Sequence, residues 1–350
     1  MSLYDEPRIS VAMPVRDGAP WLRESVESLL AQSERRFELI AVDDGSVDAS
    51  RDILESFASA DSRIRILETS REHRGIVAAL NLALEAARGP YLARMDADDI
   101  SLRQRLSAQL AALESDPSLF GVTCSAEAFP ADSVTDGMRA YVDWQNSLVS
   151  AAEIARDRFV ESSILHPTVL LRTAAVRDVL GGWHDAAWPE DWDFFLRAFG
   201  AGQKIARVPE VLFRWRQHDR QLTRSHPRYS MESLLQARAT YLARYLAPVE
   251  QGGRRVFVLG AGPVGKALAK ALARCGLVAD GIVDVDPRKI GGVVRGAGHR
   301  WRVVAHSALG AMTPRPFAVS AVAGGPARAR IRAELGKWGW KEGDDFVVAA

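Results

Sequence analysis

The sequence has few of the residues that mark several common protein classes. Its 350 residues include only two cysteines, Cys124 and Cys275, and neither has His or Cys neighbours at the spacing of a metal site. We therefore expect neither a disulfide framework nor a zinc site, which fits a reducing compartment. No apolar run reaches the roughly 18 residues of a membrane-spanning helix. The formal net charge of +1 gives no argument for a nucleic-acid partner. We expect a soluble, cytoplasmic protein. Peripheral association with the inner face of a membrane stays open, and so does the oligomeric state.

The residues that are present have the pattern of an α/β protein. Short apolar segments that predict strands alternate with segments of helical spacing, and the chain is long enough for two domains. The strand candidates are residues 9–14, 37–42, 64–67, 91–95 and 169–171. This alternation predicts a mainly parallel sheet flanked by helices. Residues 121–165 show no clear period, and we expect irregular structure there.

Polar clusters follow three of these strand candidates. They are Pro14–Asp17, Asp43–Gly45 and Asp96–Asp98. Ligands of open parallel sheets bind beyond the carboxyl ends of the strands, so we expect the three clusters to lie side by side.

The third cluster has the pattern of a divalent-metal site. Alternate residues of an extended chain point to the same side, so Asp96 and Asp98 can converge. Their hard carboxylate oxygens suit Mg²⁺ or Mn²⁺. A bare Asp-x-Asp is also common in solvated turns. Asp99 is expected to be structural.

Several longer motifs occur in the order found in one enzyme family. The segments VAMPVRDGAPWLRESVESLLAQ, ELIAVDDGSVD and GIVAALNLALEAARGPYLARMDADD resemble the start of family 2 glycosyltransferases with the GT-A fold. Later segments, HPTVLLR, PEDWDFFLRAFGAG and VPEVLFRWRQHDRQLT, resemble bacterial members of that family. The resemblance extends over residues 8 to 226.

The resemblance implies a nucleotide-sugar donor, with a UDP-sugar favoured, and a Mn²⁺ or Mg²⁺ cofactor. It assigns the metal to Asp98 and Asp96, with Asp96 also near the ribose, and the base of the nucleotide to Asp44. The nucleoside pocket would be lined by Pro14, Val15 and Arg16. Many relatives have an aromatic residue and Asn where this chain has Val15 and Arg16, which leaves base stacking and base identity open. Arg74 would meet phosphate oxygens or be a solvated side chain.

A second carboxylate pair starts the helix candidate 188–199. Pro189 fits a first helical turn, so Glu190 and Asp191 are near a helix N-terminus. The spacing predicts that Asp191 is on the buried side, where partial desolvation can tune a base, whereas Asp193 and Arg197 suit an exposed ion pair. The resemblance also implies that Asp191 is the catalytic base, with Glu190 beside it. The alternative is that both acids only complement the helix dipole.

Four further residues are candidates for acceptor, phosphate or metal contacts. Arg216 and His218 belong to a basic stretch that is either a solvated loop or a segment that closes on the diphosphate, with His218 as a third metal ligand or phosphate donor. His166 and Trp188 would face the acceptor, or serve as a structural histidine and a core tryptophan.

A second α/β unit begins near Arg255. Gly260, Gly262 and Gly265 form a Gly-x-Gly-x-x-Gly turn after a strand candidate, and Asp284 falls where a ribose-binding acid would be. The unit resembles the small Rossmann-like domains of sugar O-acyltransferases, which implies nucleotide-sugar binding. The glycines could instead serve strand–helix packing alone. NAD(P) chemistry is not favoured because no Tyr-x-x-x-Lys pattern follows.

We therefore expect three segments: a GT-A domain at 1–228, a helix and linker at 229–253, and a Rossmann-like domain at 254–350. The expected function is metal-dependent, inverting transfer of a sugar to a hydroxyl of a glycan or lipid-linked acceptor, with Asp191 as general base. The alternative is a nucleotide-sugar sensor or NAD(P)-binding protein acting through the carboxy-terminal domain. A nucleotidyltransferase is disfavoured because no Gly-rich basic loop follows the first strand.

Overall fold

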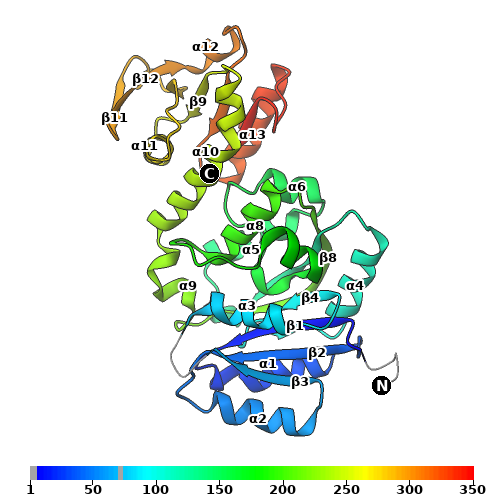
Figure 1. Cartoon of the computed structure of the whole chain (residues 1–350). Helices are drawn as coiled ribbons and strands as arrows, with labels where there is room; N and C mark the ends of the chain where they lie inside the picture. Colours follow the sequence, from blue (N-terminus) through cyan, green and yellow to red (C-terminus); the bar gives the residue numbers. More distant parts are fainter. Residues whose placement is uncertain (1–5, 70–73) are drawn as a thin grey trace. The chain divides into compact units, whose positions relative to one another are not determined.

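A computed structural model of the chain describes residues 6–69 and 74–350 (Figure 1). The chain divides into two compact units, each assembled from separate stretches of sequence. The first unit comprises Met1–Ala155, Ile164–Ala186 and Asp193–Ser225, and the second comprises Arg156–Ser163, Ala187–Trp192 and His226–Ala350.

The first unit contains an eight-stranded mixed sheet in the order β3-β2-β1-β4-β7-β6-β8-β5. Its strands are β1 (Ile9–Val15), β2 (Phe37–Asp43), β3 (Ile64–Glu68), β4 (Tyr91–Arg94), β5 (Ile100–Ser101), β6 (Gly121–Phe129), β7 (Leu170–Arg172) and β8 (Ile205–Arg216). The first four are parallel, as predicted, whereas β7 is antiparallel to both of its neighbours and β5 is antiparallel to β8.

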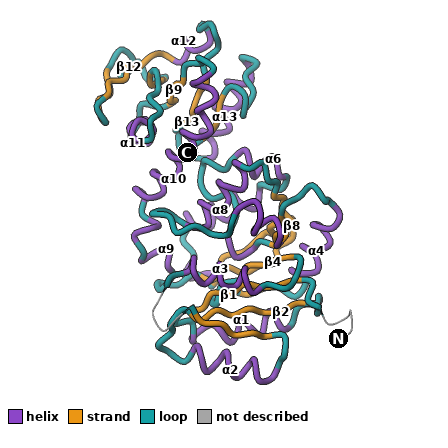
Figure 2. The backbone as a smooth tube through the Cα atoms, in the orientation of Figure 1, coloured by secondary structure: helices purple, strands orange, loops and turns teal. Residues whose placement is uncertain are grey.

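Helices cover both faces of this sheet, which Figure 2 shows as orange strands between purple helices. They are α1 (Ala19–Leu30), α2 (Ser50–Ala60), α3 (Ile76–Ala86), α4 (Arg105–Ser115), α5 (Asp136–Ser147), α6 (Ala151–Arg156), α7 (Thr173–Ala175), α8 (Glu190–Gly200) and α9 (Leu222–Ser225). Short turns η1 (Ala131–Ser133), η2 (His166–Thr168) and η3 (Val176–Leu180) complete the connections.

The apolar strands are continuous because each strand faces two cores. In β1, Ile9, Val11 and Met13 pack into one hydrophobic cluster, whereas Ala12 packs into the other. This alternation follows the period of two of an extended chain. A sheet buried on both faces therefore needs apolar residues at nearly every position, as in ISVAMPV, where the polar Ser10 is buried and donates a hydrogen bond to Glu38.

The expectation of irregular structure at 121–165 was wrong. The segment contains β6, α5 and α6. In β6, residues Gly121 to Ala126 are all buried, so the strand has no alternation of apolar and polar residues. Its polar members Thr123 and Ser125 made the segment look like a loop.

The second unit contains a six-stranded sheet in the order β11-β12-β10-β9-β13-β14, parallel except for β11. Its elements are η4 (Pro227–Tyr229), α10 (Met231–Gln251), β9 (Val256–Leu259), α11 (Pro263–Arg274), β10 (Gly281–Asp284), β11 (Val293–Gly296), β12 (His299–Ala305), α12 (His306–Gly310), β13 (Phe317–Ser320), α13 (Gly325–Lys337) and β14 (Phe346–Val348). A second α/β unit is present, as expected, and its resemblance to Rossmann-like domains stays a prediction. The linker expected at Pro248–Gly253 is shorter, because α10 continues through Pro248 to Gln251.

Candidate active site

The three polar clusters meet at the carboxyl ends of β1, β2 and β4. The parallel register pairs Val15 with Asp43 and Ala12 with Arg94, so the residues that follow each strand emerge at one edge. They form the wall of a cavity of about 540 Å³. The cavity is lined by Pro14, Val15, Arg16, Asp17, Gly18, Trp21, Asp44, Ile76, Asp96, Ala97, Asp98, His218, Arg220, Gln221 and Leu222. The prediction that these clusters lie side by side is confirmed.

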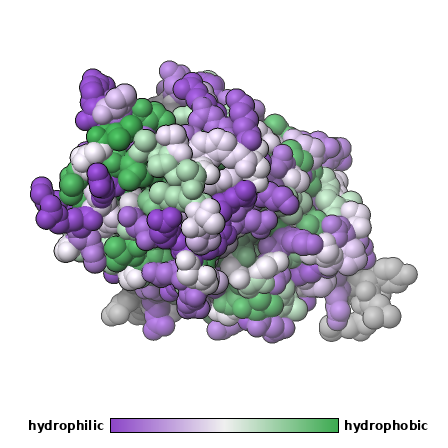
Figure 3. Space-filling model, turned by 90° about the horizontal axis from the view of Figure 1, so that it is seen from above, coloured by the Kyte–Doolittle hydropathy of each residue, from purple (hydrophilic) through white to green (hydrophobic). Residues whose placement is uncertain are grey.

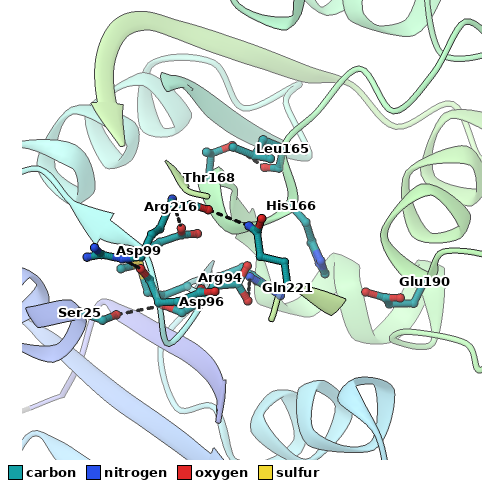
Figure 4. Close-up of polar contacts among 12 residues, drawn as sticks. Ser25, Arg94, Asp96, Asp99, Leu165, His166, Thr168, Glu190, Arg216 and Gln221 are labelled. Carbon is teal, nitrogen blue, oxygen red and sulfur yellow. Dashed lines mark hydrogen bonds and ion pairs between the residues drawn. The ribbon is translucent and has the colours of Figure 1, made fainter. Parts of the chain in front are cut away.

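Three carboxylates are grouped closely at this site. Asp96, Asp98 and Asp99 each offer one oxygen, and these oxygens lie within 4.8 Å of one another. Asp96 forms an ion pair with the buried Arg94, and its backbone carbonyl accepts a hydrogen bond from Ser25 (Figure 4).

Asp99 has a larger part in the cluster than the sequence suggested. Its Oδ1 accepts a hydrogen bond from the backbone N–H of Arg216 at 2.7 Å, which is the structural duty expected of it. Its Oδ2 is buried and has no hydrogen-bond partner within the described part of the chain. Burial, and then the negative charges of Asp98 and Asp96, raise the pKa of Asp99 well above its usual value, against the opposing effects of the Arg216 N–H and of Arg94.

This donor set fits a hard divalent cation. The ligand atoms are carboxylate oxygens, one of them buried without a partner, and their mutual repulsion is the kind that a bound cation offsets. The observation supports the predicted choice of Mg²⁺ or Mn²⁺ over softer metals.

His218 closes the cavity from the other side. Its Nε2 is 2.8 Å from Asp98 Oδ2, and its ring stacks on Trp21 with 3.8 Å between ring centroids. Because Nδ1 accepts the N–H of Arg220, the ring proton of the neutral imidazole is on Nε2 and is donated to Asp98. His218 thus contacts a predicted metal ligand directly, and its own role as a third ligand stays a prediction.

Arg216 contacts the loop that carries Asp98 and Asp99, and it does not line the cavity. Its Nε donates to the backbone carbonyl of Asp98 at 2.6 Å, and a terminal nitrogen pairs with Glu24. Its own carbonyl accepts a hydrogen bond from Gln221 (Figure 4). These contacts give Arg216 a positioning duty, and its predicted contact with phosphate or acceptor is untested.

The predicted nucleoside pocket is part of the same cavity. Asp44 is buried, and its carboxylate accepts hydrogen bonds from the Thr69 hydroxyl and from the backbone N–H groups of Arg74 and Gly75 at 2.6–3.0 Å. It therefore fixes the two ends of the connection between β3 and α3. The Arg74 side chain is exposed. Arg16 is half-exposed, 3.6 Å from Asp17.

His166 belongs to the core of the first unit. It is 5% exposed, and its Nε2 accepts a hydrogen bond from the indole N–H of Trp183 at 3.0 Å. Burial, with a smaller effect from the charge of Arg94, lowers the pKa of His166 well below its usual value. The structural alternative therefore describes it better than the predicted acceptor contact.

The carboxylate pair at the start of α8 has different surroundings for its two members. Glu190 is buried, and both of its oxygens accept a hydrogen bond from the Tyr229 hydroxyl at 2.9–3.0 Å, with Arg228 3.5 Å away. Asp191 is half-exposed, and its Oδ1 accepts the N–H of Trp192. Burial and the charges of Glu190 and Asp191 raise the pKa of Tyr229 well above its usual value, so the phenol stays a donor.

One expectation about α8 was wrong. Asp193 and its ion pair with Arg197 at 2.8 Å are largely buried rather than exposed, whereas Asp191 is partly buried, as expected. The helix is enclosed on nearly all sides, so burial extends to its polar side, which spacing alone does not reveal. Trp188 is half-buried and meets Tyr241 edge to face at 6.4 Å.

The glycine turn of the second unit serves packing at one position at least. A Cβ on Gly265 would lie 1.8 Å from the carbonyl oxygen of Gly260, whereas one on Gly262 would meet nothing within 4 Å. Asp284 accepts hydrogen bonds from the backbone N–H of Ala261 and from Lys289 at 2.8–3.0 Å. Its carboxylate therefore orders the glycine turn, and ligand binding there stays a prediction.

Sequence reasoning missed Trp21 and undervalued Asp99. Trp21 is at helical spacing with apolar residues of α1, which indicates a helix and no site role. Only its stack on His218, nearly 200 positions later in the chain, reveals its place in the cavity wall.

Comparison with known proteins identifies the family. Residues 10–177 match the family described as glycosyl transferase family 2. The putative glycosyltransferase EpsE of Bacillus subtilis is 30% identical over 232 residues, covering 65% of this chain and 80% of EpsE. This chain belongs to glycosyl transferase family 2. A second relative, the putative teichuronic acid biosynthesis glycosyltransferase TuaG of Bacillus subtilis, is 38% identical over 105 residues, which are 30% of this chain and 41% of TuaG.

Solved structures share the fold of this glycosyltransferase. Staphylococcus aureus TarS 1-349 in complex with UDP-GlcNAc superposes with a TM-score of 0.55 at 16% identity, covering 77% of this chain and 71% of that one. The mannosyltransferase PcManGT from Pyrobaculum calidifontis in complex with GDP-Man and Mn²⁺ gives 0.50 at 18% identity, covering 97% and 82%. These similarities confirm the predicted GT-A architecture. No helix within the described residues is long and apolar enough to cross a membrane.

Proposed function

We propose that this glycosyltransferase transfers a sugar from a nucleoside-diphosphate donor, with UDP as the first nucleotide to test, to a hydroxyl group of a glycan or lipid-linked acceptor. The observation that carries the proposal is the carboxylate cluster of Asp96, Asp98 and the buried Asp99, of which Asp96 and Asp98 line a 540 Å³ cavity. The UDP-GlcNAc complex of TarS supports the donor class, and the teichuronic acid biosynthesis named for TuaG supports a glycan acceptor.

The cavity residues bind and orient the donor in this proposal. Pro14, Val15 and Arg16 line the nucleoside side, Asp44 accepts from the base, and Arg16 and Arg74 supply positive charge for the diphosphate. Asp98, Asp96 and Asp99 would hold Mn²⁺ or Mg²⁺. The cation, when bound, neutralises charge that builds on the departing diphosphate. His218 holds Asp98 in place through its Nε2–H.

Asp191 is the general base of the proposed reaction. It takes the proton of the acceptor hydroxyl while that oxygen attacks the anomeric carbon. The bond from that carbon to the diphosphate oxygen breaks with its electron pair on the diphosphate. Because the hydroxyl attacks the side opposite this leaving group, the configuration at the anomeric carbon inverts. Glu190, which Tyr229 and Arg228 hold in place, positions the start of α8 and leaves the half-exposed Asp191 as the acid able to reach solvent or substrate.

Two substitutions separate the proposed roles. Asp191→Asn should lower kcat by roughly 10²–10⁴ while stabilisation of the protein against heat by UDP and Mn²⁺ persists. Asp98→Asn should abolish that stabilisation and lower kcat by about 10²–10³. The measurements are UDP or GDP release from a donor panel and the unfolding temperature with nucleotide and Mn²⁺.

The matched control is Asp219→Asn, because Asp219 is a fully exposed acid next to His218 in sequence. It should leave both measurements unchanged. Full activity in Asp191→Asn would refute the base assignment. Unchanged Mn²⁺ dependence in Asp98→Asn would refute the metal assignment.

A further inference from the structure

The β11–β12 hairpin of the second unit has two unlike faces. The strands are antiparallel, and Val293 pairs with Arg302 while Arg295 pairs with Arg300. Cross-strand partners, and residues two apart in one strand, point to the same side of a sheet. Val293, Arg295, Arg300 and Arg302 therefore share one side, which we call the arginine face.

The opposite side of the hairpin packs against the protein. Val294 and Trp301, also cross-strand partners, are 7% and 1% exposed. The four residues of the arginine face are all exposed. Its three arginine side chains form no ion pair or hydrogen bond with any residue that the structure describes. The hairpin is therefore anchored by one face and presents uncompensated positive charge on the other.

The stretch of sequence that contains the hairpin is more positively charged than the chain as a whole. Residues 263–305 contain eight lysines and arginines, three aspartates and no glutamate, a net charge of +5, whereas the entire chain has only +1. Arg288 and Lys289 pair with Asp286 and Asp284, so the excess comes from the cations of α11 and of the hairpin. Lys270 of α11 lies against the hairpin, because a Cβ on Gly296 would meet its side chain at 2.5 Å.

Apolar side chains are exposed in the same region. Hydrophobic patches on the face drawn in Figure 3 are separate and lie among hydrophilic residues. Of the eleven large hydrophobic side chains that are exposed among the described residues, five lie between residues 264 and 293. Val285 and Ile290 precede β11, and Val293 is on the arginine face itself, 44% exposed.

We propose that the arginine face docks on a membrane surface that contains anionic phospholipids. Arginines in a row attract the negative headgroup phosphates, and exposed valine and isoleucine side chains can enter the boundary between headgroups and acyl chains. A nucleic acid would use the positive charge but has no place for the apolar side chains. None of these residues lines the sugar-transfer cavity, so the proposal does not depend on the donor or acceptor.

Vesicle co-sedimentation of the full chain tests the proposal. The protein should sediment with vesicles of phosphatidylcholine and phosphatidylglycerol but not with phosphatidylcholine alone, and added salt should weaken the binding. The triple variant Arg295→Gln, Arg300→Gln, Arg302→Gln should lower the partition constant about 100-fold. Val293→Ser should lower it about threefold.

A charge-matched control replaces three other cations of the second unit, Arg330→Gln, Lys337→Gln and Lys341→Gln, and should keep binding within about twofold of the unchanged protein. Circular dichroism and the unfolding temperature check that each variant folds. The proposal is overturned if the unchanged protein ignores anionic vesicles, or if the control triple loses as much binding as the hairpin triple. It is also overturned if duplex DNA of equal phosphate concentration displaces the vesicles.

Discussion

Burial acts in opposite directions on two single residues of the first unit. It lowers the pKa of the His166 imidazole and raises the pKa of the Asp99 carboxyl, because in both cases a low-dielectric surrounding disfavours the charged form. His166 meets this cost by staying neutral and accepting the Trp183 N–H. Asp99 is beside two other carboxylates, where a cation would relieve the same cost.

The neutral state of His166 predicts an acid-sensitive fold. The folded protein leaves His166 unprotonated, whereas the unfolded chain takes up a proton as the pH falls below about 6.5. The unfolded state then binds more protons, so the free energy of unfolding decreases as the pH falls. His166→Gln, which keeps an acceptor for Trp183, should therefore lose about 2 kcal/mol less between pH 7.5 and 5 than the unchanged protein.

Urea unfolding at the two pH values measures this difference. His184→Gln is the control, because His184 is an exposed histidine of the same unit. It should lose stability with acid as the unchanged protein does. Equal acid losses in the His166 and His184 variants would show that His166 is not held neutral in the fold.

The placement of candidate site residues was predictable where the chain is extended and not where it is helical. Asp96 and Asp98 follow a short buried strand, and alternation alone indicated that they converge. In α8 the burial of Asp193 and the half-exposure of Asp191 depend on which neighbours surround the helix. Those neighbours come from distant parts of the chain, so spacing within the helix carried no information about them.

At the scale of elements, the position of Gly265 in α11 leaves no space for a side chain. The carbonyl of Gly260 fills the space next to Gly265, and both are backbone, so neither can rotate away. Gly265→Ala should destabilise the second unit by about 1–3 kcal/mol through overpacking.

The matched control is Gly336→Ala in α13, where an added Cβ meets nothing within 4 Å. That variant should be neutral or more stable by up to about 1 kcal/mol, because alanine suits a helix better than glycine. Chemical denaturation of both variants measures the difference. If Gly265→Ala were as stable as Gly336→Ala, the close approach of Gly265 to the Gly260 carbonyl would be contradicted.

Elements were predictable from sequence where one local signal dominated. The strands of the first parallel block were expected within two residues of their ends, because their apolar runs stop abruptly. The end of α10 at Gln251 was not predicted, because Pro248 and the glycines after it are typical of a linker. Proline removes one donor from the helix, and packing of the long helix compensates.

At the scale of the whole molecule, the units do not follow the linear boundaries expected at residues 228 and 253. Two short stretches from before residue 228, 156–163 and 187–192, belong to the second unit. Arg238 of α10 donates to the carbonyls of Phe159 and Val160 and lies over the ring of Trp192. Arg332 of α13 pairs with Asp157. Such contacts between distant positions leave no composition signal.

This interleaving predicts that a chain ending at Arg228 is much less stable than the full chain. It retains Phe159 and Trp192 but lacks Arg238 and Tyr245, which contact them. We expect a loss of about 3 kcal/mol or more in the free energy of unfolding, measured by tryptophan fluorescence in urea. A chain ending at Gln251 keeps α10 and should lose less. Equal stability of the two shortened chains would contradict the interleaving.

The same interleaving sets an order of events during protein synthesis. The stretch that carries Glu190 and Asp191 leaves the ribosome well before Tyr229 and Arg228, which hold Glu190, and before the helix that packs on Trp192. Domains usually fold as units while the chain emerges. Here the proposed base acquires these surroundings only after residues 228–238 are made, so we expect a chain that ends before them to be unable to transfer sugar.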